Sequence, residues 1–219
     1  MATERTKRTL LGIACVLVIL GSVSWIYFTE IRAPRHNVGL HQRIGQVMAE
    51  QTAALVGSKG QIVLVAIETG DQPELKTELD AFKAAIKKGG DIGIKEYLLD
   101  TKDQPKYGVG TGLSARRFVR IVNKNLKANV IVSFVGAPHW SDTEFGELNI
   151  DKMPKFIAES RASDRLAKLF DKKVLQVAIV SRFQFPAPGT RDPKTPQEWF
   201  IKRYQIVTPE NDAELPKPE

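Results

Sequence analysis

The feature that most constrains this chain is a stretch without charged residues near its start, covering the nineteen residues 10–28. Its sequence is LLGIACVLVILGSVSWIYF. As a helix rising about 1.5 Å per residue, it would be roughly 28 Å long, close to the hydrocarbon thickness of a bilayer. Trp25 and Tyr27, near its end, are residue types that favour the membrane interface. The stretch therefore predicts a transmembrane helix and a protein that works attached to a membrane.

Basic residues on both sides of this stretch bear on its orientation. Arg5, Lys7 and Arg8 precede it, and Arg32 and Arg35 follow it. The positive-inside rule favours, by a small margin, a cytoplasmic N-terminus and a main domain outside the cytoplasm, in the periplasm if the source is bacterial. The expected organisation is a cytoplasmic flank (1–9), a transmembrane helix (10–28), a juxtamembrane linker (29–37), an extracytoplasmic α/β domain (38–207) and an acidic, proline-containing tail with no core to join (208–219).

The same N-terminal features also fit a secretory signal peptide that is cleaved. Ser22 and Ser24 offer the small residues of a cleavage site. The apolar stretch is long for a signal peptide, however, and it continues past the site through Trp25, which favours an uncleaved anchor. Both alternatives place most of the chain across the membrane.

Beyond the stretch, runs of β-branched residues alternate with apolar residues at helical spacing. Continuous apolar runs such as IVLVAI (62–67) and VIVSFV (130–135) are typical of strands buried on both faces, as in parallel sheets covered by helices. The predicted fold is a three-layer α/β sandwich with an open, mainly parallel sheet of about five strands in the order 2-1-3-4-5. The predicted helices cover 38–56, 74–88, 113–126 and 163–170, and the predicted strands cover 62–67, 92–99, 130–135, 156–158, 175–180 and, at the sheet edge, 199–207.

Two segments carry a resemblance to a known family. They are GQIVLVAIETGDQPELKTELDAFKAAIKKGGDIGIKEYLLD, starting at Gly60, and KANVIVSFVGAP, starting at Lys127. The first resembles the opening βαβ unit of a lobe of type I periplasmic binding proteins, and the second resembles a later helix end, strand and loop of the same lobe. In that family two lobes clamp a small solute, and this chain has room for one lobe. The resemblance implies the fold and, with a second copy supplying the missing lobe, a site for a solute.

Ligands of open parallel sheets bind beyond the carboxyl ends of the strands. The loops expected there carry Asp71, His139, Trp140 and Arg182, which together offer a carboxylate, an imidazole, an indole and a guanidinium. That mixture could hold a small polar solute. These four residues are therefore the candidate ligand-binding residues.

A second set of candidates lies in the proline-rich part of the chain, 186–196. Pro186 and Pro188 stiffen this segment, and Trp199 and Phe200 follow it. Aromatic residues beside prolines often pack a loop onto the body of a domain, and they also anchor protein interfaces. We interpret these four residues as a candidate interface for a membrane-protein partner or for self-association.

Few residues could hold a metal ion. Cys15 is the only cysteine, so no disulfide within the chain and no thiolate cluster is possible, and its surroundings are those of a small residue inside a transmembrane helix. The three histidines, His36, His41 and His139, lack metal-binding spacing. We predict no metal and no cofactor.

No recognised catalytic motif is present. The loop 108–115 matches G-x-G-x-x-A nominally, but it does not follow the first strand, and we interpret it as a loop that ends in a Thr or Ser helix cap. An enzyme would have to use Asp71, Asp142 or His139. The formal charge of +7 is spread along helices without interleaved aromatic residues, which argues against nucleic acid as a partner.

Two functions remain open from the sequence. The first is a non-enzymatic accessory, scaffold or assembly subunit of a membrane complex, because the tether raises the concentration of the domain near membrane partners. The second is a membrane-tethered domain that binds or senses a small solute. The two differ in whether a protein or a solute is the main partner.

Overall fold

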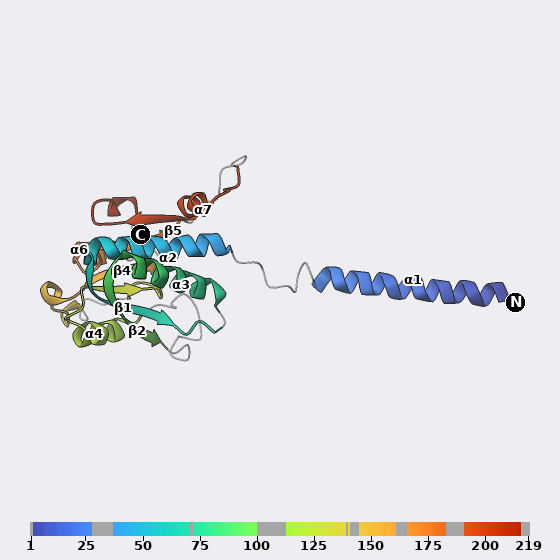
Figure 1. Ribbon diagram of the computed structural model, residues 1–219, viewed down its shortest axis with the longest axis horizontal. Coiled ribbons are helices and arrows are strands. Elements are labelled where there is room, and N and C mark those ends of the chain that lie inside the picture. Colours follow the sequence, from blue (N-terminus) through green and yellow to red (C-terminus); the bar gives the residue numbers. More distant parts are fainter. Residues whose placement is uncertain are drawn as a thin grey trace. The chain divides into compact units, whose positions relative to one another are not determined.

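The structure is a computed structural model that describes residues 2–27, 37–70, 72–99, 113–138, 140, 145–160, 166–182 and 191–215 (Figure 1). By its contacts the chain divides into two units, Met1–His36 and Asn37–Glu219.

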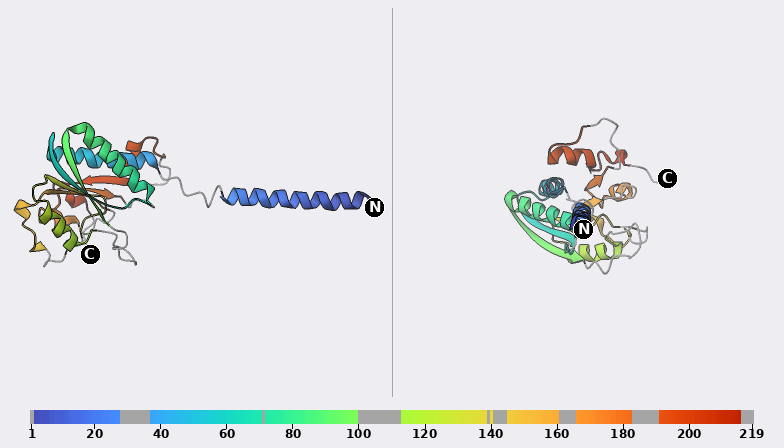
Figure 2. Two further views of the ribbon diagram at one scale, coloured as in Figure 1. Left: turned by 60° about the horizontal axis from the view of Figure 1, so that its bottom comes forward. Right: turned by 90° about the vertical axis from the view of Figure 1, so that its right-hand side faces the viewer.

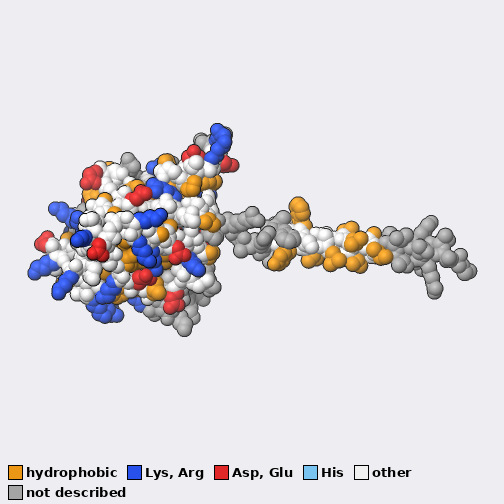
Figure 3. All heavy atoms as spheres, in the orientation of Figure 1, with side chains coloured by type: hydrophobic (Ala, Val, Ile, Leu, Met, Phe, Trp, Pro, Cys, Tyr) orange, Lys and Arg blue, Asp and Glu red, His pale blue; other side chains and the backbone are white. Residues whose placement is uncertain are grey.

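The described part of the first unit is dominated by one helix, α1 (Ala2–Ile26). Ten large apolar side chains between Ile13 and Tyr27 are 50–72% exposed, and Figure 3 shows them along this helix. Within the residues that the structure describes, no helix combines the length and the hydropathy of a membrane-spanning segment. The transmembrane helix over 10–28 stays a prediction.

The second unit is built on a six-stranded sheet in the order β2-β1-β3-β4-β5-β6. The first five strands are parallel, and β6 pairs antiparallel with β5. This confirms the predicted parallel α/β sheet with the order 2-1-3-4-5, to which β6 adds a sixth strand. The strands are β1 (Lys59–Ile67), β2 (Asp91–Leu99), β3 (Val130–Ser133), β4 (Lys155–Ser160), β5 (Val177–Ser181) and β6 (Tyr204–Val207).

Helices cover both faces of the sheet, which gives the three layers visible in Figure 2. The core on one face gathers side chains of α2, α3 and α7, and the core on the other face gathers side chains of α4 and α6. Strand side chains alternate between the two cores, so Ile62 and Leu64 face one while Val63 and Val65 face the other. The helices of this unit are α2 (Val38–Val56), α3 (Pro73–Gly89), α4 (Ala115–Lys124), α6 (Leu166–Asp171) and α7 (Pro196–Arg203).

Helices α2 and α3 pack closely because a glycine lies where they meet. A Cβ atom placed on Gly45 would overlap the backbone carbonyl oxygen of Glu78 and lie 3.0 Å from Cβ of Ala81. Near the same contact, Nδ1 of His41 lies 2.5 Å from Oε1 of Glu78. Glycine thus allows a backbone approach that any larger residue would prevent.

The predicted edge strand over 199–207 is wrong in its first half. Thr195 begins helix α7 instead, because its hydroxyl accepts a hydrogen bond from the backbone N–H of Glu198 at 3.2 Å and Pro196 occupies the first turn. Only Tyr204–Val207 forms the edge strand, β6.

The expectation that the tail has no core to join is also wrong. Leu215 is 4% exposed and packs into the core beside α4 and α6. Asn211 holds the turn before it, since its Oδ1 accepts from the backbone N–H of Thr208 at 2.7 Å and its Nδ2 donates to the carbonyl of Ile206 at 3.1 Å.

Candidate functional site

The carboxyl ends of β1, β3, β4 and β5, four of the five parallel strands, lie at one edge of the sheet. Glu68 follows β1, Ser160 ends β4 and Arg182 follows β5. Neighbouring strands lie about 4.8 Å apart, so the three spacings from β1 to β5 put Glu68 and Arg182 roughly 14 Å apart across this edge. We call this region the carboxyl edge, and it is where ligands of such sheets bind.

The exit from β3 is shaped by a turn at the centre of the carboxyl edge. The hydroxyl of Ser133 donates to the carbonyl oxygen of Gly136 at 2.7 Å and accepts from the backbone N–H of Val135 at 3.3 Å. Gly136 has a φ of +90°, a left-handed conformation that favours glycine. The turn redirects the chain at the strand end towards Trp140.

Trp140 lies in an aromatic cluster with residues from α4, β4 and the segment after β3. Its ring stacks on Phe145, with centroids 4.9 Å apart and an interplanar angle of 19°, and meets Phe118 edge to face at 5.6 Å. Phe118 also contacts Phe156 at 4.6 Å. The indole Nε1 of Trp140 is buried and has no hydrogen-bond partner among the described residues. The ring is thus held by its neighbours, with the indole nitrogen enclosed.

Buried polar residues at the ends of the central strands were not among the sequence candidates. Ser133 is fully buried, Glu159 is 9% exposed and Ser160 is 6% exposed. Carboxylate and hydroxyl groups are rarely buried without a hydrogen-bonding partner. These three residues therefore make the interior of the domain polar at the carboxyl ends of β3 and β4. The signal available in the sequence was the pair Glu159-Ser160 directly after the apolar run Phe156–Ala158.

Arg182 extends the carboxyl edge beyond β5. Its backbone N–H donates to the carbonyl of Arg203 at 2.7 Å, which continues the pairing of β5 with β6. Arg182 and Arg203 therefore face each other across two antiparallel strands, and both are exposed. Two like charges in this position repel each other, and an anion bound between them would relieve that repulsion.

The structure tests the sequence candidates unevenly. Trp140 is half-buried in the aromatic cluster, Arg182 is exposed at the carboxyl edge, Trp199 is partly exposed on α7, and Phe200 is 4% exposed and stacks on Tyr204. The binding and interface roles of all of them stay predictions. Candidates that lie outside the described residues are Asp71, His139, Asp142, Pro186, Pro188 and most of the loop 108–115.

The described end of that loop corrects one detail. Ser114 is the N-cap residue of α4, but its side chain makes no capping hydrogen bond. Within the described parts of the chain, no group of three or more His, Cys, Asp or Glu side chains is placed to hold a metal ion.

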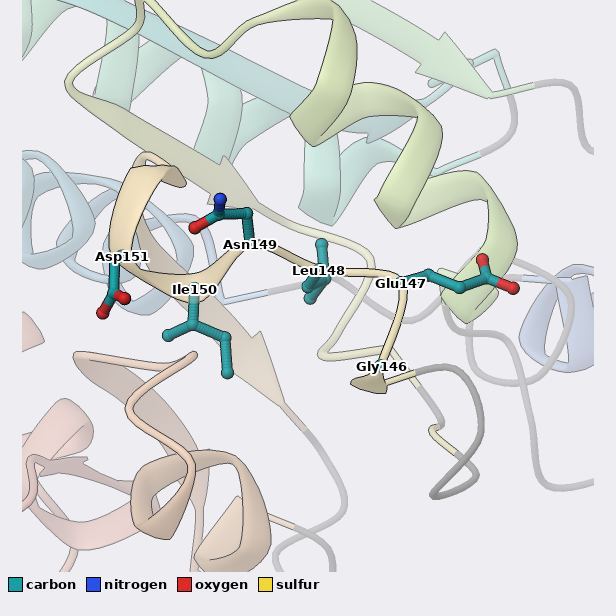
Figure 4. Close-up of a pocket in the computed structure, with 6 residues that line it drawn as sticks. All are labelled: Gly146, Glu147, Leu148, Asn149, Ile150 and Asp151. Carbon is teal, nitrogen blue, oxygen red and sulfur yellow. The ribbon is translucent and has the colours of Figure 1, made fainter.

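The surface has a shallow hollow of about 640 Å³ next to the short helical turn before β4 (Figure 4). One continuous segment lines it, and Figure 4 shows the side chains of Glu147, Asn149 and Asp151 pointing in different directions. The hollow directly precedes β4, so it lies towards the amino ends of the strands. A site with converging groups is therefore better sought at the carboxyl edge.

A polar contact joins the outer strand β2 to α4. Nζ of Lys95 donates to Oδ1 of Asn125 at 2.9 Å, and Nδ2 of Asn125 donates to the Tyr97 hydroxyl at 3.0 Å. The hydrogen bond from Asn125, with a smaller effect of Lys95, lowers the pKa of Tyr97 despite its partial burial. We assign this contact to packing, since it lies within the β2 strand rather than at the carboxyl edge.

Comparison with known proteins gives a fold but no family. No family model matches the chain, and no curated protein matches its sequence. Solved structures with a similar fold include the arabinose binding protein AraP from Geobacillus stearothermophilus, with a TM-score of 0.56, 12% identity, and coverage of 80% of this chain and 63% of that one.

Two further structures show the same likeness. A sugar-binding protein of a sugar ABC transporter from Bacillus halodurans has a TM-score of 0.52 and 13% identity, with 78% of this chain and 63% of that chain covered. An ABC transporter solute binding protein from Burkholderia graminis, in complex with D-arabinose, has a TM-score of 0.51 and 16% identity, with 80% and 61% covered. The matched part thus spans about three fifths of each of these proteins. The expected resemblance to periplasmic binding proteins is confirmed at the level of the fold.

Proposed function

We propose that this protein is a non-enzymatic, membrane-tethered binding domain that recognises a small polar solute, of the monosaccharide class, at its carboxyl edge. The observation that carries the proposal is the fold, a parallel sheet of the order β2-β1-β3-β4-β5 that resembles sugar-binding proteins. Parallel sheets of this kind bind ligands where their carboxyl ends meet.

The side chains at this edge suit a sugar. A monosaccharide offers hydroxyl groups to charged hydrogen-bonding partners and an apolar ring face to an aromatic side chain. Glu68 and Arg182, both exposed, bring charges from opposite sides of the edge, and the half-buried Trp140 brings an aromatic ring.

The chain supplies one α/β domain, and the matched part covers about three fifths of the length of the similar solved structures. A solute bound at one open edge would remain partly in water, which limits its affinity. A second copy of the chain, placed edge to edge with the first, would enclose it. A tether favours such pairing because it concentrates both copies at one membrane.

The tether itself is part of the proposal. Exposed apolar side chains all around α1, such as Leu17, Val18 and Trp25, suit a helix surrounded by lipid. With the basic N-terminal flank in the cytoplasm, the binding domain would lie outside it. The accessory-subunit hypothesis stays a prediction, and purification in mild detergent followed by identification of bound proteins tests it.

The test of the binding function is a thermal shift screen of the full chain in mild detergent against monosaccharides, starting with D-arabinose. A solute present at 100 times its Kd stabilises the folded state by about 2.7 kcal/mol, which corresponds to a rise in Tm of roughly 5–10 °C for a domain of this size. Arg182→Ala should remove a charge-assisted hydrogen bond and weaken binding about tenfold or more.

The matched control is Arg120→Ala, which removes an exposed cation from α4 and should leave binding unchanged. Both variants should unfold at the wild-type Tm without solute. A screen in which no monosaccharide raises the Tm, or an Arg182→Ala variant that binds as well as wild type, would refute the proposal.

A further inference from the structure

We propose that α7 and the segment before it form a contact surface for anionic membrane lipids, an inference that rests on the proposed tether. The surface consists of Arg191, Lys194, Ile201, Lys202 and Arg203, and we call it the basic α7 surface. Figure 3 shows basic and apolar side chains together where Figure 1 places α7.

The charge of this surface is positive. Its four cationic side chains face two carboxylates, which leaves a formal charge of +2. Both carboxylates have local partners, because Asp192 lies 3.8 Å from Nζ of Lys202 and Glu198 accepts from the backbone N–H of Lys194 at 2.7 Å. Arg191, Lys194 and Arg203 are exposed, and the two carboxylates reduce the positive charge that this surface offers to an external anion.

The same surface also carries apolar and aromatic side chains, whereas a helix face that contacts only water is usually polar. Ile201 is 56% exposed on α7. Trp199 lies beneath two of the cations, with Nζ of Lys202 5.7 Å and Cζ of Arg203 4.9 Å from its ring centre. Tryptophan with neighbouring cations and an exposed aliphatic side chain is the combination that favours the headgroup region of a bilayer.

The basic α7 surface lies beside the start of α2, the first helix of the second unit. α7 packs along α2: Nε of Arg43 donates to Oε1 of Gln197 at 2.5 Å, and Pro196 lies against Gly39 in the first turn of α2. Figure 1 shows the start of α2 and α7 side by side.

The length of chain between α1 and α2 limits how far the surface can lie from a bilayer. At roughly 3.5 Å per residue, the connection from Tyr27 to Asn37 reaches at most about 35 Å. Cationic side chains that come within about a Debye length of the bilayer, roughly 10 Å at 0.1 M salt, are attracted to anionic lipids.

A shallow hollow of about 420 Å³ on this surface suits a lipid phosphate. Three cations line it, Arg191, Lys194 and Lys202, together with Ile201, Pro193 and the carboxylates Asp192 and Glu198, so the formal charge of its lining is +1. Cations around a hollow can form charge-assisted hydrogen bonds to phosphate oxygens, while Ile201 faces the acyl boundary.

The test uses the full chain in nanodiscs with an environment-sensitive fluorophore on Ile201→Cys. Cys15 is the only cysteine, so a Cys15→Ala background gives a single labelling site. In nanodiscs that mix phosphatidylcholine with phosphatidylglycerol, we expect the emission to shift to shorter wavelength. In phosphatidylcholine alone, or at high salt, the shift should be lost.

Two charge-reversed variants make the comparison specific. Arg191→Glu, Lys194→Glu and Lys202→Glu together should abolish the shift. An equal change on α4, Arg116→Glu, Arg120→Glu and Lys124→Glu, should preserve it, since α4 covers the other face of the sheet.

Each contrary outcome has its own meaning. A chain that elutes apart from the nanodiscs overturns the tether and this contact together. A chain that co-elutes but shows no shift, or shows one that survives charge reversal of the basic α7 surface, overturns the lipid contact alone. A shift seen only after native membrane proteins are added would assign the surface to a protein partner instead.

Discussion

Gly45→Ala is the substitution for which the structure makes the sharpest prediction. The new methyl group would overlap the carbonyl oxygen of Glu78 and press on Ala81, so α2 and α3 would have to move apart. Alanine stabilises a helix interior by about 1 kcal/mol relative to glycine. Overpacking against a backbone that cannot rotate away costs about 3 kcal/mol, the upper part of the usual range.

The net effect of Gly45→Ala is a loss of about 2 kcal/mol in the free energy of unfolding, or roughly 4–8 °C in Tm for a domain of this size. Urea and thermal unfolding of the full chain in detergent, followed by tryptophan fluorescence, would measure it. Gly89→Ala in α3 is the control, because no atom lies within 4 Å of the place its new methyl group would take, and its stability should be unchanged or slightly higher. Wild-type stability in Gly45→Ala would contradict the close approach of the two helices.

Two further predictions concern α4. Phe118→Ala should lower the free energy of unfolding by about 3–5 kcal/mol, measured by urea unfolding, because it removes a fully buried ring from the aromatic cluster. Asn125→Ala should raise the lowered pKa of Tyr97 towards about 10, measured by ultraviolet titration with Tyr97→Phe to identify the signal. Because the pKa of Tyr97 is lower in the folded state, its contribution to stability is complete above about pH 10 and is lost as the pH falls through the folded pKa, so stability at neutral pH should not depend on it. A Tyr97 signal unchanged by Asn125→Ala would rule out the hydrogen bond as the cause.

Much of the sheet could be predicted because its strands are buried on both faces. Runs such as Ile62–Ile67 are apolar throughout and mostly β-branched, and this composition favours a central parallel strand. The strand order 2-1-3-4-5 was predictable because it is one of the common orders of open, doubly wound sheets. The helix α2 was equally clear, since its apolar residues recur at helical spacing and Gly57 ends it with a φ of +83°.

The mistakes came where local signals compete. Apolar and polar residues alternate partly over 199–207, which suggested a strand. Thr195 and Pro196, however, start a helix just before them, and this helix continues to Arg203. The strand begins only at Tyr204, where the chain pairs with β5. Leu215 is a single apolar residue in a polar tail, and its burial depends on a core that only the complete fold creates. The same holds for the contact at Gly45.

The location of the candidate site could be predicted from the sequence, but the residues that form it could not. The rule that ligands bind at the carboxyl ends of strands led to Trp140 and Arg182. It did not reveal that Trp140 is fixed by two phenylalanines, nor that Glu159, near the end of β4, is buried. Such contacts join residues far apart in the chain, so the spacing of residues along the sequence does not predict them.

The most direct test of the proposed function is hydrogen–deuterium exchange of the full chain in detergent, with and without a stabilising monosaccharide in excess. Binding at the carboxyl edge predicts slower exchange in the segments 68–70, 134–140 and 181–182. The segment 146–152, beside the hollow at the amino ends of the strands, should exchange as before. Protection confined to 146–152, or none in any of these segments, would contradict solute binding at the carboxyl edge.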